Sequence, residues 1–225
     1  MQPFKITYKI LDYTLDPPPV MLFDKEEHVA INMRTALYGI LPKEYVFDIR
    51  VGDYVYSVEK ERIHTIQYQV SSVLREMLGF KETYIPSKER LENMGLPILD
   101  KNELYSSIHL YYVYVSDSPI WDFFFTKDSD VVKVFPRFTQ GVRGGSDFVP
   151  LLPPWTVDQS QPINQPPVLC SKKQIVTELY KLYLNMVQDA KKMYPEEFKE
   201  EEYMEEAYEE WKEEMEQYKV AIEQL

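Results

Sequence analysis

Residues 108–115 carry β-branched or aromatic side chains at almost every position, in the order Ile-His-Leu-Tyr-Tyr-Val-Tyr-Val. Such residues fit a pleated strand better than a helix. Both alternating sets of this stretch are apolar or aromatic. A strand of that kind is normally an interior strand with other elements packed on both faces. We therefore predict a central strand here, with the rest of the chain arranged around it.

Strict alternation predicts further strands. Residues 4–10 alternate apolar and polar, and the phase changes near Ile10–Leu11, where we expect a β-bulge before the strand ends at residues 16–19. Residues 45–51 and 54–58 also alternate, and Gly52-Asp53 between them is typical of a type II′ hairpin turn that sets Val51 opposite Tyr54. A second hairpin is predicted from 121–126 and 131–135.

Helical spacing of apolar residues predicts helices at 24–40, 60–78 and 87–94, the last two ending at Gly79 and Gly95. The order β-α-β-β-α, followed by the strand at 108–115, matches a split βαβ, ferredoxin-like start. We therefore predict an α+β fold, with a mostly antiparallel sheet of five to seven strands, two helices on one face and an extra hairpin.

The C-terminal part is predicted to be a helical hairpin. Ser171 and Gln174 form a capping box, and Cys170 and Ile175 occupy the positions of a hydrophobic staple. The first helix should end before Pro195, which suits the first turn of the next helix. That last helix carries a heptad-like apolar seam: Met204, Tyr208, Trp211, Met215, Tyr218 and Ile222.

Three segments follow from these patterns: an α+β body over 1–149, a proline-rich strap or linker over 150–170, and the helical hairpin over 171–225. Six prolines between 150 and 167 predict the strap, and three glycines within 139–147 predict a loop before it. A hydrophobic content of 44% excludes wholesale disorder. No apolar run approaches the roughly 18 residues of a membrane span, and no basic-then-apolar leader begins the sequence, so we expect a cytoplasmic protein.

The charge is concentrated in one place. Residues 196–216 hold twelve glutamates and two lysines, so this segment contributes −10 of the net −12. Most charge runs are simply solvated helix faces. Four of these glutamates nevertheless form a row at i, i+4 spacing that could occupy a basic groove. The candidate partner-binding residues are Glu201, Glu205, Glu209, Trp211 and Glu213.

Motifs for chemistry are weak. Glu61-x-x-His64 is half of a di-metal motif whose other parts are missing, and the remaining histidines are scattered. The glycines of 141–145 precede prolines rather than the helix that a phosphate-binding loop needs. Cys170 has a structural role as the staple residue, and a lone cysteine forms no internal disulfide. We therefore predict no catalytic, cofactor-binding or metal-binding residues.

The function predicted from the sequence is that of a non-enzymatic protein-interaction or assembly subunit. Its acidic C-terminal helix would act on a protein partner with a basic surface, or in self-assembly, without binding duplex nucleic acid, which requires a basic face. Abundant Glu and Lys with few asparagines suggest a thermophilic source, and we expect a viral or mobile-element protein, located in the virion if viral. The alternative is an enzyme with a site assembled around the 139–147 loop from Arg143, Ser146, Asp147 and Asp122.

Overall fold

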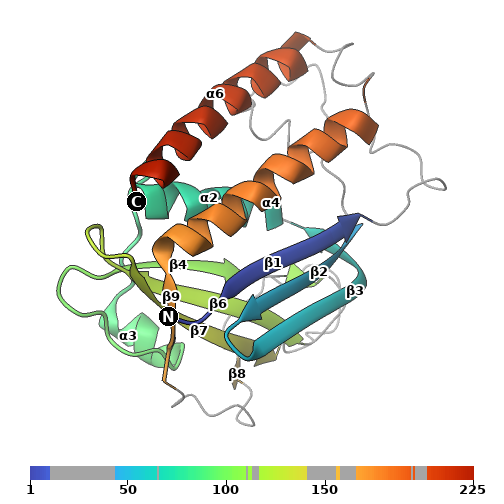
Figure 1. Cartoon of the computed structure of the whole chain (residues 1–225). Helices are drawn as coiled ribbons and strands as arrows, with labels where there is room; N and C mark the ends of the chain where they lie inside the picture. Colours follow the sequence, from blue (N-terminus) through green and yellow to red (C-terminus); the bar gives the residue numbers. More distant parts are fainter. Residues whose placement is uncertain are drawn as a thin grey trace, which may run out of the picture.

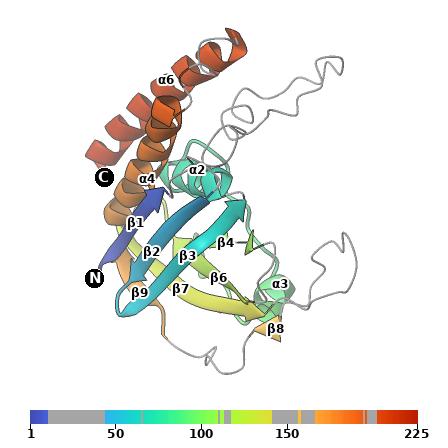
Figure 2. The same ribbon diagram turned by 90° about the vertical axis from the view of Figure 1, so that its right-hand side faces the viewer.

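The computed structural model describes residues 1–10, 44–64, 66–109, 111–112, 117–140, 156–157, 166–193, 195 and 202–225. All of its strand pairings are antiparallel, and they form two sheets. The helices α2 (Ile66–Leu78), α4 (Lys172–Met193) and α6 (Glu202–Gln224) lie over one side of these sheets (Figure 1), and a 90° turn shows the same layering (Figure 2). The predicted α+β class is confirmed, but the strands are divided between two sheets instead of forming one.

The first sheet has the order β1-β2-β3-β5. Its strands are β1 (Phe4–Ile10), β2 (Glu44–Val51), β3 (Tyr54–His64) and β5 (Tyr111–Tyr112). The second sheet has the order β4-β6-β7-β8, and β9 also pairs with β7. Its strands are β4 (Leu104–His109), β6 (Asp117–Phe125), β7 (Val131–Gln140), β8 (Thr156–Val157) and β9 (Val168–Ser171). The described helices are α2 (Ile66–Leu78), α3 (Lys88–Asn93), α4 (Lys172–Met193) and α6 (Glu202–Gln224).

Local signals placed both hairpins correctly. Val51 pairs with Tyr54 as predicted, and Gly52 has φ +58°, the sign that a type II′ turn requires at its first central position. The second hairpin, β6–β7, turns at 126–130 and is longer than predicted. The two paired residues differ in burial: Val51 is fully buried, whereas Tyr54 is 38% exposed.

The predicted central strand is wrong in its topology. Residues 104–109 form β4 at the end of the second sheet, whereas 111–112 form β5 at the end of the first. Both faces of β4 are covered. Ile108 lies in the main core, and Tyr105 lies on the opposite face in a small cluster with Leu91 and Phe124. Apolar residues on a strand therefore predict that its faces are buried, but they do not predict whether its edges are paired with other strands.

The start of the predicted 60–78 helix is also wrong. β3 continues to His64, and α2 begins at Ile66. Residues 61–64 pair with β2 and with β5, for example Glu61 with Tyr45 and Ile63 with Tyr112. Such long-range backbone pairing outweighs a helix propensity of a few tenths of a kcal/mol per residue. The rest of α2 is as expected, with a buried stripe and with Gly79 at φ +81° after its end.

The two sheets are joined on both sides. On one side the chain passes from β4 to β5. On the other, Gln2, which precedes β1, donates its backbone N–H to the carbonyl of Leu169 on β9 at 2.7 Å. Between the sheets, the rings of Phe4 and Phe123 meet edge to face with centroids 6.0 Å apart. One core cluster contains residues of both sheets and of α2, α4 and α6.

The start of α4 is interlocked with the β6–β7 turn. Ser171 Oγ accepts from Gln174 N at 3.2 Å, as the capping box predicts, and Asp130 Oδ1 accepts from Lys173 N at 2.9 Å. The buried Lys172 ammonium donates to the carbonyls of Thr126 and Lys127 at 3.1 and 2.7 Å. Burial lowers the pKa of Lys172. Cys170 and Ile175, the predicted staple residues, are both fully buried in the main core.

Several predictions concern residues outside the described ranges: the helix at 24–40, the loop after Gln140 and most of the proline-rich strap. The end of that strap, Val168–Ser171, is β9 and pairs with β7 instead of serving as a linker. β1 pairs with β2 in regular register through Ile10, and Leu11 of the predicted bulge is not described. The ferredoxin-like start is not confirmed, since the described first sheet has the order β1-β2-β3-β5.

Candidate interaction surface on the last helix

The apolar seam of α6 packs within the chain. Trp211 is 3% exposed and meets Tyr183 of α4 edge to face, with centroids 6.1 Å apart. Tyr208 stacks on Trp211, and Tyr218 contacts Phe80 at 5.2 Å between centroids. Trp211, which the sequence placed among the candidate partner-binding residues, therefore belongs to the core of this structure and not to its surface.

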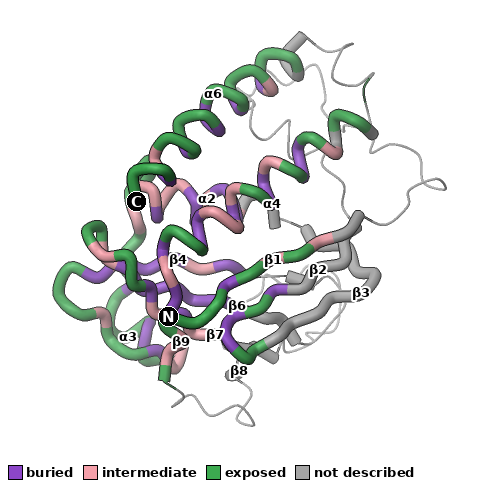
Figure 3. The backbone as a smooth tube through the Cα atoms, viewed as in Figure 1, coloured by how far each residue is buried: buried purple, intermediate pink, exposed green. Residues whose placement is uncertain are grey.

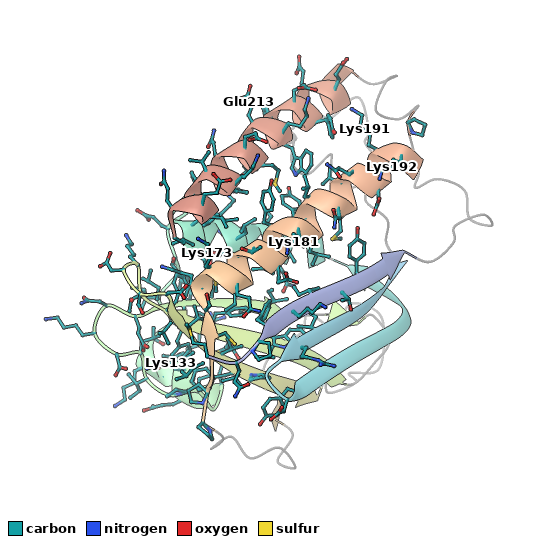
Figure 4. The ribbon with its side chains drawn as sticks, in the orientation of Figure 1. Lys133, Lys173, Lys181, Lys191, Lys192 and Glu213 are labelled. Carbon is teal, nitrogen blue, oxygen red and sulfur yellow. The ribbon has the colours of Figure 1, made fainter. Side chains whose placement is uncertain are left out.

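The opposite face of α6 is acidic and open to solvent. Glu205, Glu209 and Glu213 of the glutamate row are all exposed, as are Glu206, Glu210 and Glu216. Glu213 points away from α4 in Figure 4, and the outer face of α6 is exposed along its described length in Figure 3. Glu201, the first member of the predicted row, lies outside the described residues.

Little positive charge compensates this face. Residues 202–225 contain nine glutamates and two lysines, which gives a net charge of −7. Lys212 donates to both carboxylate oxygens of Glu209 at 2.9 and 2.7 Å, and this bond raises the pKa of Lys212. Lys219 lies 3.7 Å from Glu216. The two lysines offset only two of the nine glutamates, so the helix keeps most of its negative charge.

Glu214 is the exception. It is 8% exposed, accepts a hydrogen bond from Tyr218 Oη, and lies 3.4 Å from Arg75 Nε of α2. The sequence reading grouped it with the solvated glutamates. The spacing of Glu214 could have predicted its burial. It lies three residues after Trp211 and four before Tyr218, and therefore beside the apolar seam.

Three lysines of α4 that Figure 4 labels, Lys181, Lys191 and Lys192, make contacts with nearby residues of α4 or α6. Lys181 pairs with Glu178 at 3.2 Å and Lys192 with Asp189 at 3.3 Å. Lys191 lies 3.5 Å above the ring of Tyr208, a cation–π contact with α6. These contacts place α4 beside α6 without neutralising the glutamate row.

The polar edge of α4 also covers the free edge of β1, which the sequence did not reveal. Gln174 Oε1 accepts from Phe4 N and Glu178 Oε2 from Ile6 N, both at 3.3 Å. Residues i and i+4 of a helix rise about 6 Å, close to the roughly 6.7 Å between alternate strand residues. The two periodicities therefore let one helix face satisfy successive edge donors, which protects an exposed strand from pairing with another chain.

The alternative enzyme site is not assembled by the described residues. Arg143, Ser146 and Asp147 lie outside them, and Asp122 is fully buried with its Oδ1 accepting from Tyr105 Oη at 2.7 Å. Burial raises the pKa of Cys170 to about 11, so its thiol is protonated at neutral pH.

A hydrogen-bonded group links α2 to β4: Ser106 Oγ donates to Glu76, and Lys81 Nζ lies 2.7 Å from Ser72 Oγ and 3.1 Å from Glu76. The Glu76 carboxylate lies between the serines and the lysine, so we interpret the group as a structural ion-pair network.

Within the described ranges, no three His, Cys, Asp or Glu side chains gather to hold a metal ion, and no helix is long and apolar enough to cross a membrane. Comparison with protein-family models, curated proteins and solved structures gives no match.

Proposed function

We propose that the protein is a non-enzymatic interaction or assembly subunit whose last helix presents a glutamate face to a basic surface of a protein partner. The observation that supports this most is the orientation of α6. Its seam is buried against α4 and α2, so the row Glu205, Glu209 and Glu213 faces outward when the helix is docked.

The density of like charge favours recognition over simple solvation. Glutamates at i, i+4 repel and weaken the helix by a few tenths of a kcal/mol per pair, and lysines at alternate positions would solubilise it equally well. An acidic face of this kind accelerates encounter with a basic partner and rejects acidic ones, including nucleic acid. A second copy of the chain is the other candidate partner within this class.

The test compares two variants with the same loss of charge. One carries Glu205→Gln, Glu209→Gln and Glu213→Gln. The control carries Glu82→Gln, Glu89→Gln and Glu92→Gln, three exposed acids that do not belong to α6. Proteins captured from the native source by the wild type and by the control, but not by the α6 variant, are then measured for association rate in about 50 and 500 mM salt.

We expect the α6 variant to associate at least tenfold more slowly in low salt, and the wild-type rate to fall as salt rises. Equal association rates for all three proteins, with no salt dependence, would contradict the proposal. The glutamates would then serve only to keep the protein in solution. The solution mass of the wild type and the α6 variant, compared in the same buffers, identifies the case in which the partner is a second copy.

A thermophilic, viral or mobile-element source, with a virion or cytoplasmic location, is part of the same proposal. It is supported by composition alone, chiefly the wealth of Glu and Lys beside few asparagines. A thermal midpoint above about 90 °C would be in keeping with a hot source, while one in the 45–65 °C range of mesophilic domains would count against it.

A further inference from the structure

α4 and α6 are anchored very differently. α4 is interlocked with the β6–β7 turn through Asp130 and Lys172, and it hydrogen-bonds along the edge of β1. α6 packs mainly against α4 and α2 through one face, by side-chain contacts. Loss of the α6 contacts would therefore leave the interlocked start of α4 and the pairings of both sheets in place.

The interface under α6 is apolar at its centre and poorly satisfied at its polar groups. In the described part of the chain, Arg75 Nε and Trp211 Nε1 are buried donors without a hydrogen-bond acceptor. The Arg75–Glu214 pair, at 3.4 Å, lies outside hydrogen-bonding geometry for that nitrogen. Buried donors without acceptors, and charges taken out of water, both oppose docking because water would satisfy them in the undocked state.

The helix itself also depends on docking. Its exposed face carries like charges at i, i+4, which weaken an isolated helix, and most helical stability in proteins comes from packing of an apolar face. Docking and helix formation in α6 are therefore coupled. If the seam leaves α2 and α4, the segment should lose its helix as one unit.

We infer that α6 is a releasable cover over the apolar faces of α2 and α4. It opens as a unit while α4 and both sheets stay folded, and opening exposes the seam of α6 together with the α4 residues beneath it, including Tyr183. The groups that limit its docking are Arg75, whose Nε lacks an acceptor, and Glu214, whose charge is taken out of water. This inference concerns the seam side of α6 and stands whether or not the glutamate face binds a partner.

Amide hydrogen exchange of the full chain tests the opening directly. We expect amides of 207–222 to exchange as a group, at least tenfold faster than those of 175–187 in α4, with one common dependence on low urea concentrations. A common urea dependence distinguishes opening of the whole helix from fraying at its ends. Equal protection of the two helices would overturn the inference, and so would exchange confined to the ends of α6.

A variant tests the cause. Arg75→Met and Glu214→Leu replace the two charged groups of the interface by apolar ones of similar size. Tyr218→Phe removes the hydroxyl that Glu214→Leu would leave without its acceptor. We expect α6 to exchange at least fivefold more slowly than in the wild type, with the exchange of α4 unchanged. Unchanged or faster exchange of α6 would show that these groups do not limit docking. If this variant does not fold, the wild-type comparison of α6 with α4 decides the inference.

Discussion

Both the backbone conformation and the space around residue 52 require a glycine. Its φ of +58° disfavours an L side chain, and a Cβ there would lie 3.2 Å from Cγ1 of Val168 on β9. Gly79 has φ +81° but nothing within 4 Å of the same position, so it carries only the backbone demand. Gly52 therefore carries, besides its backbone demand, a close approach between the β2–β3 turn and β9.

We expect Gly79→Ala to destabilise the fold by about 1 kcal/mol and Gly52→Ala by about 2 kcal/mol or more. Urea unfolding of the two variants, compared with the wild type, measures both. Equal losses would mean that Val168 moves aside at no cost and that the turn is not pressed against β9.

Tyr8 gives the protein a dependence on alkaline pH. Burial, with the hydrogen bond from Tyr8 Oη to Asp189 at 2.7 Å and the charge of that carboxylate, raises the pKa of Tyr8 well above its usual value near 10. The folded state therefore holds this proton where the unfolded state loses it. Its stabilisation is complete below about pH 10 and is lost as pH rises further.

Tyr8→Phe should lower stability below pH 10, because the hydrogen bond is lost, and should make the decline above pH 10 shallower. Free energies of unfolding from urea titrations between about pH 8 and pH 11 measure this slope. Tyr180 and Lys133, whose pKa values are also raised, stay in both proteins and serve as a constant background. An unchanged slope would show that Tyr8 does not contribute to it.

Trp211 anchors the last helix. Trp211→Ala removes a buried indole that packs against Tyr183 and Tyr208, and we expect a loss of about 3 kcal/mol. Hydrogen exchange of α6 should record this loss, since the residue stabilises the docked helix. A change within experimental error would mean that the seam is not packed in the isolated chain.

At the scale of the element, α6 divides its two faces between different tasks. The seam fixes the helix on α4 and α2, while the row of glutamates opposes its formation. Glu205→Gln, Glu209→Gln and Glu213→Gln together should leave the fold intact and make α6 more stable by a few tenths of a kcal/mol, since two i, i+4 repulsions are removed.

The gain is limited because Glu209 also loses its bond with Lys212. Thermal melts followed by far-ultraviolet circular dichroism in low salt measure it, with the Glu82, Glu89 and Glu92 variant as the control for net charge. The gain should vanish in high salt, which screens the same repulsion. A variant less stable than the wild type would show that the glutamates support the helix.

At the scale of the molecule, the two sheets share one core and should unfold together. Phe4 of the first sheet is almost fully buried against Phe123 of the second, and their edge-to-face contact crosses the space between them. We expect Phe4→Ala to cost about 3–4 kcal/mol. Amides of β2 and of β6 should become faster in parallel, although β6 has no backbone pairing with β1. Acceleration confined to β1, β2 and β3 would identify the sheets as separate units.

Features that depend on neighbours along the chain could be predicted without the structure. The Gly52-Asp53 turn, the cap at Ser171, the stops at Gly79 and Gly95 and the seam of α6 all rest on backbone geometry within a few residues, and each is found where the pattern predicts it. The exposure of the glutamates could be predicted too, because the face of a helix opposite a buried seam points to solvent.

The pairing of strands and the burial of polar groups depend on contacts between distant segments, so they could not be predicted from local patterns. The apolar stretch around Ile108 could not reveal that its two ends belong to different sheets, because burial of a strand's faces is independent of the pairing of its edges. Residues 61–64 were predicted to be helical from their spacing, but they belong to β3. Their backbone pairs with β2 and β5, which are distant in the sequence. Trp211 was assigned to a partner and Glu214 to solvent for the same reason: the partners that bury them, Tyr183 and Arg75, lie 28 and 139 residues away along the chain.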